Sequence, residues 1–375
     1  MLFFGVGLTW VWNEATIRSE ETEMVRRNEI AAMFVGRSAP ATPPQKKKCT
    51  GKQVSPNLNL GPKGKNMRFL HTVSIQQQSF GADGKAVHDL PVNPLSVIIL
   101  MLRPLNVSAT ASHFASYMKI AAALNSIQVN HRGQSVVSMS GGDAAAMAYM
   151  ASGVQMLQAN HTATDNHRRA IPIPIFLGNS AYDPSSCFPG SSRGDLTISL
   201  DFDVASEGYD TMEYSIETIE LLDAKPTSYV QQVEQRQTFD AVGLNDVDLP
   251  VGNVYSGVLL AGGDVFTGAT PAPTWGRVAS LVDNQTVGYS SIDFETIHGL
   301  GGLMGVFPGG YDSHAGGTIP SNVGSDFAEY AYLPFDPRGG GMTGLDTKSA
   351  RRFHLRCESE ATGTVRLVPR EVIRL

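Results

Sequence analysis

The chain has 375 residues, of which 42% are hydrophobic and only 17% are charged, and its formal net charge at pH 7 is −6. This length allows one or two domains with sizeable cores, and the negative charge argues against a protein whose whole surface binds nucleic acid. The three cysteines, Cys49, Cys187 and Cys357, lie far apart without a CxxC pair, so the sequence favours neither a structural zinc site nor a disulfide framework. The charged share is below the usual value of about a quarter, which predicts a largely neutral surface suited to packing against copies of the same chain.

Residues 1–66 predict a flexible basic arm. No acidic residue occurs between Ile30 and Ala82, and five prolines interrupt this stretch. Such a segment cannot bury enough apolar surface to offset the entropy lost on ordering. Three interpretations are open: a solvated tail, a leader ahead of a protein that starts near Met67, or an arm that contacts membrane lipid or packaged nucleic acid. The residues that would make such a contact are Arg37, Lys46, Lys47, Lys48, Lys52, Lys63, Lys65 and Arg68.

Residues 67–222 predict a first strand-rich domain. After a strand at 68–78, the continuous apolar run 95–102 has the length of a fully buried strand. Residues 122–130 and 134–140 predict a hairpin, with Gly133 supplying a positive φ at the turn. Apolar residues at helical spacing then predict a helix over 141–157.

Three more strands complete this region. Residues 171–177 alternate apolar residues with prolines, which cannot donate to a ladder, so we expect an edge strand there. Residues 195–204 alternate apolar and polar side chains, and 214–222 have a similar pattern.

Residues 223–375 predict a second strand-rich domain after a turn at 223–227. A linker at 246–250, a glycine-rich loop at 299–317 and a closing hairpin formed by the last two strands are also expected. The expected strands are 229–242, 254–260, 277–283, 288–297, 330–335, 350–357 and 362–368. Because neither region alternates strands with helices, the predicted fold class is all-β, with two consecutive β-sandwiches or barrels of about eight strands each.

Little in the sequence indicates chemistry. His161 and His167 flank Asp165, but their spacing does not suit a metal site on one helix. Asp201 and Asp203 share one face of a strand, where paired carboxylates could do acid–base work, although polar positions that alternate along a strand normally face water. No phosphate-binding loop, serine-nucleophile elbow or HExxH motif occurs. We therefore expect no enzyme activity, no cofactor and no metal.

Four stretches resemble the double jelly-roll major capsid proteins of tailless icosahedral DNA viruses, such as tectiviruses and corticoviruses. They are a strand pair leading into a helix, an edge strand followed by a loop and a long strand, and two later strand–loop segments. In order, they span Leu124–Asp143, Ile171–Phe202, Asn245–Gly263 and Tyr332–Val368. The arm 1–66 departs from this family, whose members begin close to the first strand.

The resemblance implies two eight-stranded jelly rolls, 67–222 and 223–375, in a structural protein of the virion. Homotrimers of pseudo-hexagonal outline would tile an icosahedral shell over an internal membrane, after assembly in the host cytoplasm. Penton and minor capsid proteins would be further partners, and the arm would meet membrane lipids or genome. Two rival interpretations are a carbohydrate-binding or glycoside-processing β-sandwich and a minor virion component such as a penton or spike protein. Sugar binding is disfavoured because only Trp275, among the tryptophans, lies outside the arm.

Overall fold

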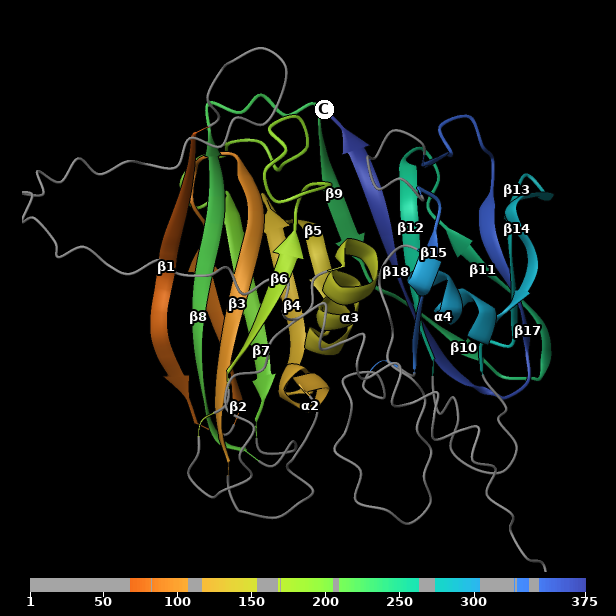
Figure 1. Cartoon of the computed structure of the whole chain (residues 1–375), viewed down its shortest axis with the longest axis horizontal. Helices are drawn as coiled ribbons and strands as arrows, with labels where there is room; N and C mark the ends of the chain where they lie inside the picture. Colours follow the sequence, from red (N-terminus) through yellow and green to blue (C-terminus); the bar gives the residue numbers. More distant parts are fainter. Residues whose placement is uncertain are drawn as a thin grey trace, which may run out of the picture. The chain divides into compact units, whose positions relative to one another are not determined.

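The computed structural model shows a strand-built molecule with short helices (Figure 1). It describes residues 68–81, 83–106, 117–153, 168, 170–204, 209–262, 274–303, 327, 329–336 and 344–375. These residues belong to one compact unit, Gly61–Leu375, whereas the unit Met1–Leu60 lies outside the described ranges. None of the helices described is long and apolar enough to cross a membrane.

The first eight strands form a sandwich of two four-stranded layers. One layer has the order β1-β8-β3-β6 and the other has the order β2-β7-β4-β5, with every neighbouring pair antiparallel. This arrangement of eight strands is a jelly roll. The strands are β1 (Arg68–Phe80), β2 (Asp83–Asp89), β3 (Leu95–Asn106), β4 (Leu124–His131), β5 (Gln134–Met139), β6 (Ile171–Phe176), β7 (Leu196–Asp203) and β8 (Tyr209–Leu222).

The remaining strands repeat this arrangement. One layer has the order β9/β10-β18-β12-β15 and the other β11-β17-β13-β14; the two-residue strand β16 pairs with one end of β12. Since β9 and β10 both pair with β18, they count as one interrupted strand, and the chain positions are again 1-8-3-6 and 2-7-4-5. The strands are β9 (Ser228–Val233), β10 (Gln235–Phe239), β11 (Gly243–Leu249), β12 (Val254–Ala261), β13 (Arg277–Val282), β14 (Gln285–Asp293), β15 (Tyr330–Pro334), β16 (Leu345–Asp346), β17 (Phe353–Ser359) and β18 (Gly363–Arg374).

The two jelly rolls join through a parallel contact between β5 and β9. Val137 pairs with Gln232 and Ser138 pairs with Val233, and the amide of Glu234 donates to the Ser138 carbonyl at 2.7 Å. This contact merges one layer of each jelly roll into a ten-stranded sheet. A core cluster fills the first jelly roll and includes residues of β12, β15 and β18, while a second core cluster fills the other jelly roll.

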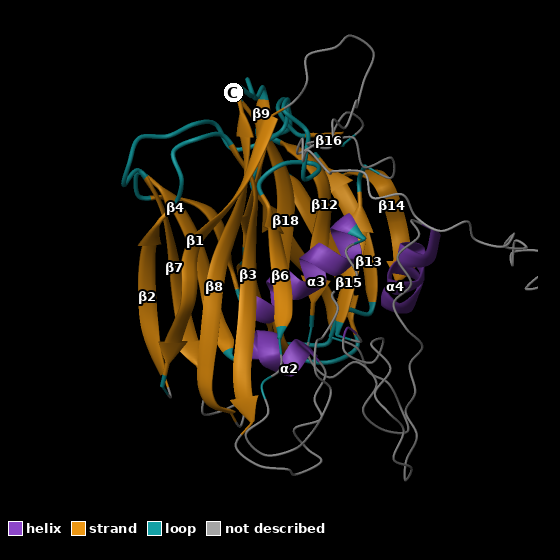
Figure 2. Ribbon diagram, turned by 60° about the vertical axis from the view of Figure 1, so that its left-hand side comes forward, coloured by secondary structure: helices purple, strands orange, loops and turns teal. Residues whose placement is uncertain are grey.

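Helix α3 (Gly141–Ser152) lies at this junction, in contact with β6 of the first jelly roll and β12 and β15 of the second (Figure 2). The Ser140 side chain caps its start by accepting from the amide of Asp143 at 3.1 Å. The helix is shorter than the expected 141–157, because Gly153 adopts a left-handed C-cap with φ of 65°. The end of the expected helix, 154–157, lies outside the described residues. The other helices are α2 (Tyr117–Ala122) and α4 (Phe294–Leu303).

Several expectations are confirmed. Strand β6, with its prolines, lies at the edge of its sheet. The β4–β5 hairpin turns at Arg132 and Gly133, whose φ values of 52° and 82° define a type I′ turn. The β13–β14 pair forms a second hairpin of this kind, with φ of 49° at Asp283 and 65° at Asn284.

Other expectations are wrong. The single strand 229–242 is divided between β9 and β10, and the linker 246–250 falls largely in β11. In β11 the acidic residues at alternate positions face solvent while Val247 and Leu249 are buried. Strand β14 ends at Asp293, where α4 begins and runs into the expected glycine-rich loop. Strand β2 and helix α2 had no counterpart among the expected elements.

The expected closing hairpin is also absent. Strand β17 pairs with β11 and β13 in one sheet, whereas β18 pairs with β9, β10 and β12 in another. The short connection at 360–362 therefore crosses from one layer of the sandwich to the other. A short loop predicts a hairpin from local signals, but the jelly roll pairs strands that are distant in the chain.

Candidate functional site

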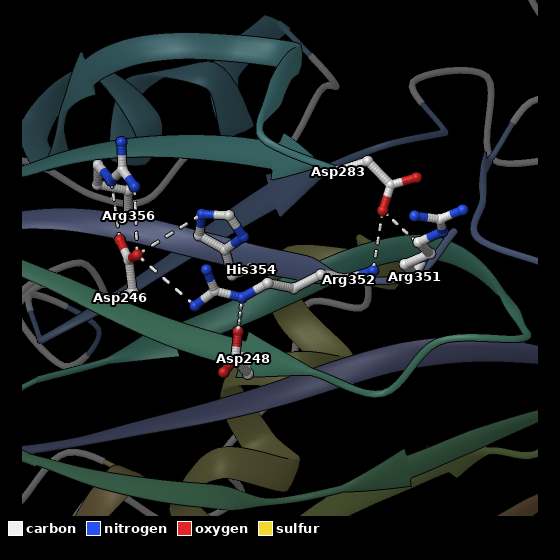
Figure 3. Close-up of polar contacts among 7 residues, drawn as sticks. All are labelled: Asp246, Asp248, Asp283, Arg351, Arg352, His354 and Arg356. Carbon is white, nitrogen blue, oxygen red and sulfur yellow. Dashed lines mark hydrogen bonds and ion pairs between the residues drawn. The ribbon is translucent and has the colours of Figure 1, made fainter. Parts of the chain in front are cut away.

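The most concentrated polar network among the described residues lies on the outer face of β11 and β17 (Figure 3). Asp246 stands opposite Arg356 and accepts hydrogen bonds from its Nε at 2.8 Å and its Nη2 at 3.2 Å. Arg352 donates from Nε to Asp248 at 2.6 Å and places Nη2 3.6 Å from Asp246. The hydrogen bond from Arg356 lowers the pKa of Asp246, so this carboxylate is ionised at neutral pH.

His354 lies at the centre of this network. Its side chain is fully buried, its Nε2 is 3.8 Å from Asp246, and neither ring nitrogen makes a hydrogen bond. Burial, and next the charge of Arg352, lower the pKa of His354, so the imidazole is neutral at neutral pH. Its cross-strand neighbours are Asp248 and Leu281. No nucleophile that a general base could activate lies among these neighbours.

The turn between β13 and β14 holds one end of the network in place. Asp283 accepts hydrogen bonds from the backbone amides of Arg351 at 2.9 Å and Arg352 at 3.0 Å. These bonds fix the loop just before β17 (Figure 3), and with it the start of the Arg352 side chain. The cluster is thus an ordered charged patch on one sheet face, in which each carboxylate already has a partner.

A second polar site lies where the two jelly rolls meet. Asp143 of α3 is fully buried and accepts from Arg366 of β18, at 3.1 Å from Nη2 and 3.3 Å from Nε. Arg366 also donates to the Tyr330 hydroxyl at 3.3 Å. Burial, followed by the charge of Asp143, raises the pKa of Tyr330 well above its usual value. Tyr330 and Arg366 line a groove of about 470 Å³. The ion pair between Asp143 and Arg366 ties the helix of one jelly roll to a strand of the other.

Most of the arm residues predicted to contact an anionic partner lie outside the described residues. Arg68 is the one that the structure describes: it begins β1, and its Nε donates to Asp223 at 3.0 Å. Both of these side chains are exposed, so the pair adds little stability. The other seven lie outside the described residues, namely Arg37, Lys46, Lys47, Lys48, Lys52, Lys63 and Lys65.

The residues weighed for catalysis or metal binding show no reactive arrangement where they are described. Asp201 and Asp203 do share the outward face of β7, and Asp201 pairs with Lys85 of β2 at 3.3 Å. The group of His161, Asp165 and His167 lies outside the described residues.

Trp275 cannot serve as a platform for a sugar in this structure. It is fully buried, packs edge-on against Phe239 and donates from Nε1 to the Ala261 carbonyl at 3.1 Å. Two cysteines are buried as well, and burial raises the pKa of Cys187 to about 11 and that of Cys357 to about 12. Both thiols are therefore protonated and poorly reactive at neutral pH.

Sequence reasoning missed the charged patch because the acids of β11 were interpreted as a linker. The alternation of Arg352, His354 and Arg356 with buried residues was available as a signal for one polar strand face. The pairing of these residues with Asp246 and Asp248 depends on strand register, which the sequence does not provide.

Comparison with solved structures shows which known proteins share this fold. No family model matches the sequence, and no curated protein matches it. The major capsid protein P2 from Bacteriophage PM2 superposes with a TM-score of 0.55 at 11% identity, covering 82% of this chain and 98% of its own. The STIV MCP gives a TM-score of 0.60 at 12% identity, covering 82% and 97%, and the Faustovirus major capsid protein gives 0.51 at 8%, covering 85% and 92%. The chain thus has the fold of viral major capsid proteins, with two jelly rolls in succession.

Proposed function

We propose that this chain is a structural major capsid protein that assembles as homotrimers into the icosahedral shell of a virus. The observation that carries the proposal is the repeated strand order, 1-8-3-6 facing 2-7-4-5 in both halves, in a chain that matches viral capsid proteins over nearly their whole length. A shell built from identical subunits needs rigid blocks that make repeated symmetric contacts. Two jelly rolls fused by a continuous sheet and a buried ion pair provide such a block.

The division into jelly rolls at 67–222 and 223–375 is part of this proposal. The turn between β8 and β9 separates the strands of the first jelly roll, β1–β8, from those of the second, β9–β18, and each set has its own core cluster. The first cluster also takes in residues of the second set, such as Leu259 and Val368. The two jelly rolls therefore share part of one core, which suits a block that must keep its geometry in a shell.

The polar sites support a structural role over catalysis. The charged patch consists of carboxylates already paired with arginines, and Trp275 is fully buried. A glycoside-processing enzyme needs two carboxyl groups that face each other across a substrate, and the outward acids of β7 face solvent along a single strand instead.

Assembly of the purified full-length chain tests the function. Analytical ultracentrifugation should find a species of three chains, and negative-stain microscopy should show particles of pseudo-hexagonal outline. A chain that remains monomeric at micromolar concentration, or that binds glycans on an array, would contradict a shell role. In purified virus, a shell protein should be the most abundant band on a stained gel, whereas a penton or spike protein would be a minor band.

We further propose that the basic arm meets an anionic membrane or the genome inside the shell. The support is the acid-free stretch from Ile30 to Ala82 with its lysine cluster. Binding of the full chain to anionic vesicles and to DNA should fall as salt is raised from low to moderate, because electrostatic contacts are screened. A variant with Lys46, Lys47 and Lys48 changed to Gln should bind more weakly, and unchanged binding would reject this role.

A further inference from the structure

The two strands that join the jelly rolls have equivalents in the same chain that do not pair with each other. It joins β5, the fifth strand of the first jelly roll, to β9, the first strand of the second. The equivalent fifth strand of the second jelly roll is β14, and the equivalent first strand of the first jelly roll is β1. Within the described residues, β14 pairs only with β13 and β1 pairs only with β8, so each leaves one edge open.

The equivalent strands also share sequence. After their type I′ turns, β5 begins Gln134-Ser135-Val136 and β14 begins Gln285-Thr286-Val287. The other pair matches at its end, where β1 closes with Gln-Gln-Gln-Ser-Phe at 76–80 and β10 closes with Gln-Arg-Gln-Thr-Phe at 235–239. The free strands therefore match the internal contact in position, and they match it in sequence at β5 and at β10, the strand that continues β9.

The other four edges of the described sheets carry prolines, charged side chains or a packed helix, whereas β1 and β14 contain β-bulges but have long stretches without Asp, Glu, Lys or Arg. Strand β6 has prolines at alternate positions, β2 and β11 carry charged side chains, and β15 is packed against α4. Such features are how proteins protect exposed edges from pairing with other chains. By contrast, β14 has no charged residue from Gln285 to Ile292, and β1 from Phe69 to Phe80 has only His71 as a titratable group.

The open edge strand β1 is also unusually apolar for a surface. Three of its side chains are about half exposed: Phe69 at 46%, Leu70 at 45% and Val73 at 53%. They lie in the same part of the strand as the β9 residues that contact β5. Apart from Arg68 at its start, this edge strand of 13 residues has no Asp, Glu, Lys or Arg, and such an edge would invite uncontrolled pairing unless it has a specific partner.

We propose that this partner is β14 of a second copy of the chain, which pairs with β1 in parallel as β5 pairs with β9. The contact is head-to-tail, so repeating it produces either a ring or an open filament. The inference rests on the proposed function, in which three chains of two jelly rolls each close a ring of six. Every neighbouring pair of jelly rolls in that ring then meets through a fifth and a first strand.

A charged residue on the open edge tests the contact. Val73→Asp on β1 or Ser290→Asp on β14 should convert trimers to monomers, measured by light scattering after gel filtration. The matched control is Val87→Asp on β2, another edge strand, where the side chain is 65% exposed and trimers should persist. Melting temperature measured alongside should stay close to that of the unchanged chain, because both valines face solvent. Trimers that survive Val73→Asp would overturn the proposal.

Mixed cysteine variants test which strands meet. One chain carries Leu70→Cys and another carries Thr286→Cys, and mild oxidation of the mixture should link the two different chains. A mixture of Val87→Cys and Thr286→Cys should not link. Trimers without the first cross-link would overturn the edge contact while leaving the capsid function standing, whereas an unchanged chain that forms no oligomer would overturn both.

Discussion

The two jelly rolls share a strand order but use their equivalent helices differently. Helix α3 follows the fifth strand of the first jelly roll, and all ten residues from Gly141 to Met150 are buried. Helix α4 follows the fifth strand of the second, where Phe294 and Ile297 are buried but Glu295 and Thr296 are exposed. The difference lies in what covers each helix, because the second jelly roll covers α3. The same topology therefore places a buried helix at the junction between the jelly rolls and a partly exposed helix, among the described residues, at the equivalent position of the second jelly roll.

The seventh strands differ in the same way. Outside the core, β7 presents two neutral residues and two aspartates, of which Asp201 pairs with Lys85. Strand β17 instead presents the arginine-rich network centred on His354. The two jelly rolls thus carry different side chains on their outer faces, while their inward faces keep the alternation of apolar and polar residues that a sandwich core requires.

The largest expected effect concerns the ion pair at the junction. Asp143→Ala leaves Arg366 without its carboxylate, and breaking such a buried pair costs about 3 kcal/mol. Urea denaturation should show this loss of unfolding free energy. Asp201→Ala, which removes a partly exposed pair, should cost less than about 1 kcal/mol. Equal effects of the two substitutions would refute the importance of the junction.

Enlarging a side chain on each helix sharpens the contrast between α3 and α4. Ala146 is fully buried, so Ala146→Leu should destabilise the chain by about 1–3 kcal/mol through overpacking. Thr296→Leu on the exposed side of α4 should change the unfolding free energy by no more than about 0.5 kcal/mol. Thermal and urea unfolding provide the measurement, and a tolerated Ala146→Leu would show that α3 is not closely packed.

The capping interaction of α3 should have a smaller effect. Ser140→Ala removes the acceptor for the Asp143 amide and should cost about 1 kcal/mol. Ser140→Asp retains an acceptor at the cap and should recover most of the loss. If Ser140→Asp and Ser140→Ala are equally unstable, the cap is not the cause.

The smallest effect concerns the charged patch and its pH dependence. Because Arg356 lowers the pKa of Asp246 in the folded chain, the patch stabilises the fold above the ordinary pKa of an aspartate. That contribution disappears as pH falls through the lowered folded-state pKa. Asp246→Asn should therefore cost about 1 kcal/mol or less near pH 7 and nothing at the acid end. The check is to measure the unfolding free energies of the unchanged chain and of Asp246→Asn from neutral to strongly acidic pH. A difference between them that grows as the pH falls would contradict this.

Local patterns sufficed for much of the fold. The prolines of β6 predict an edge strand, Gly133 predicts a tight turn, and the alternation in β7 predicts a half-buried strand. Pairing between distant strands is another matter: β17 and β18 are neighbours in the chain but belong to opposite sheets, and no local signal reports that. The acids of β11 misled for a related reason, since they resemble a turn until β17 is known to lie beside them.

The candidate site was less predictable than the fold. The charged patch requires the register that sets Asp246 opposite Arg356, and the junction pair joins residues 223 positions apart in the chain. The arm residues were chosen by composition, and of these the structure describes Arg68, whose partner Asp223 is distant in sequence. Composition identifies a basic segment, but it does not identify what the segment binds.

Cryo-electron microscopy of the purified full-length assembly is the decisive measurement for the contact between β14 and β1. We expect a ring of six sandwich densities from three chains, with β14 of each chain beside β1 of the next and β5 beside β9 within each chain. Two-fold dimers, isolated monomers, or rings closed through the charged edges β2 or β11 would contradict it.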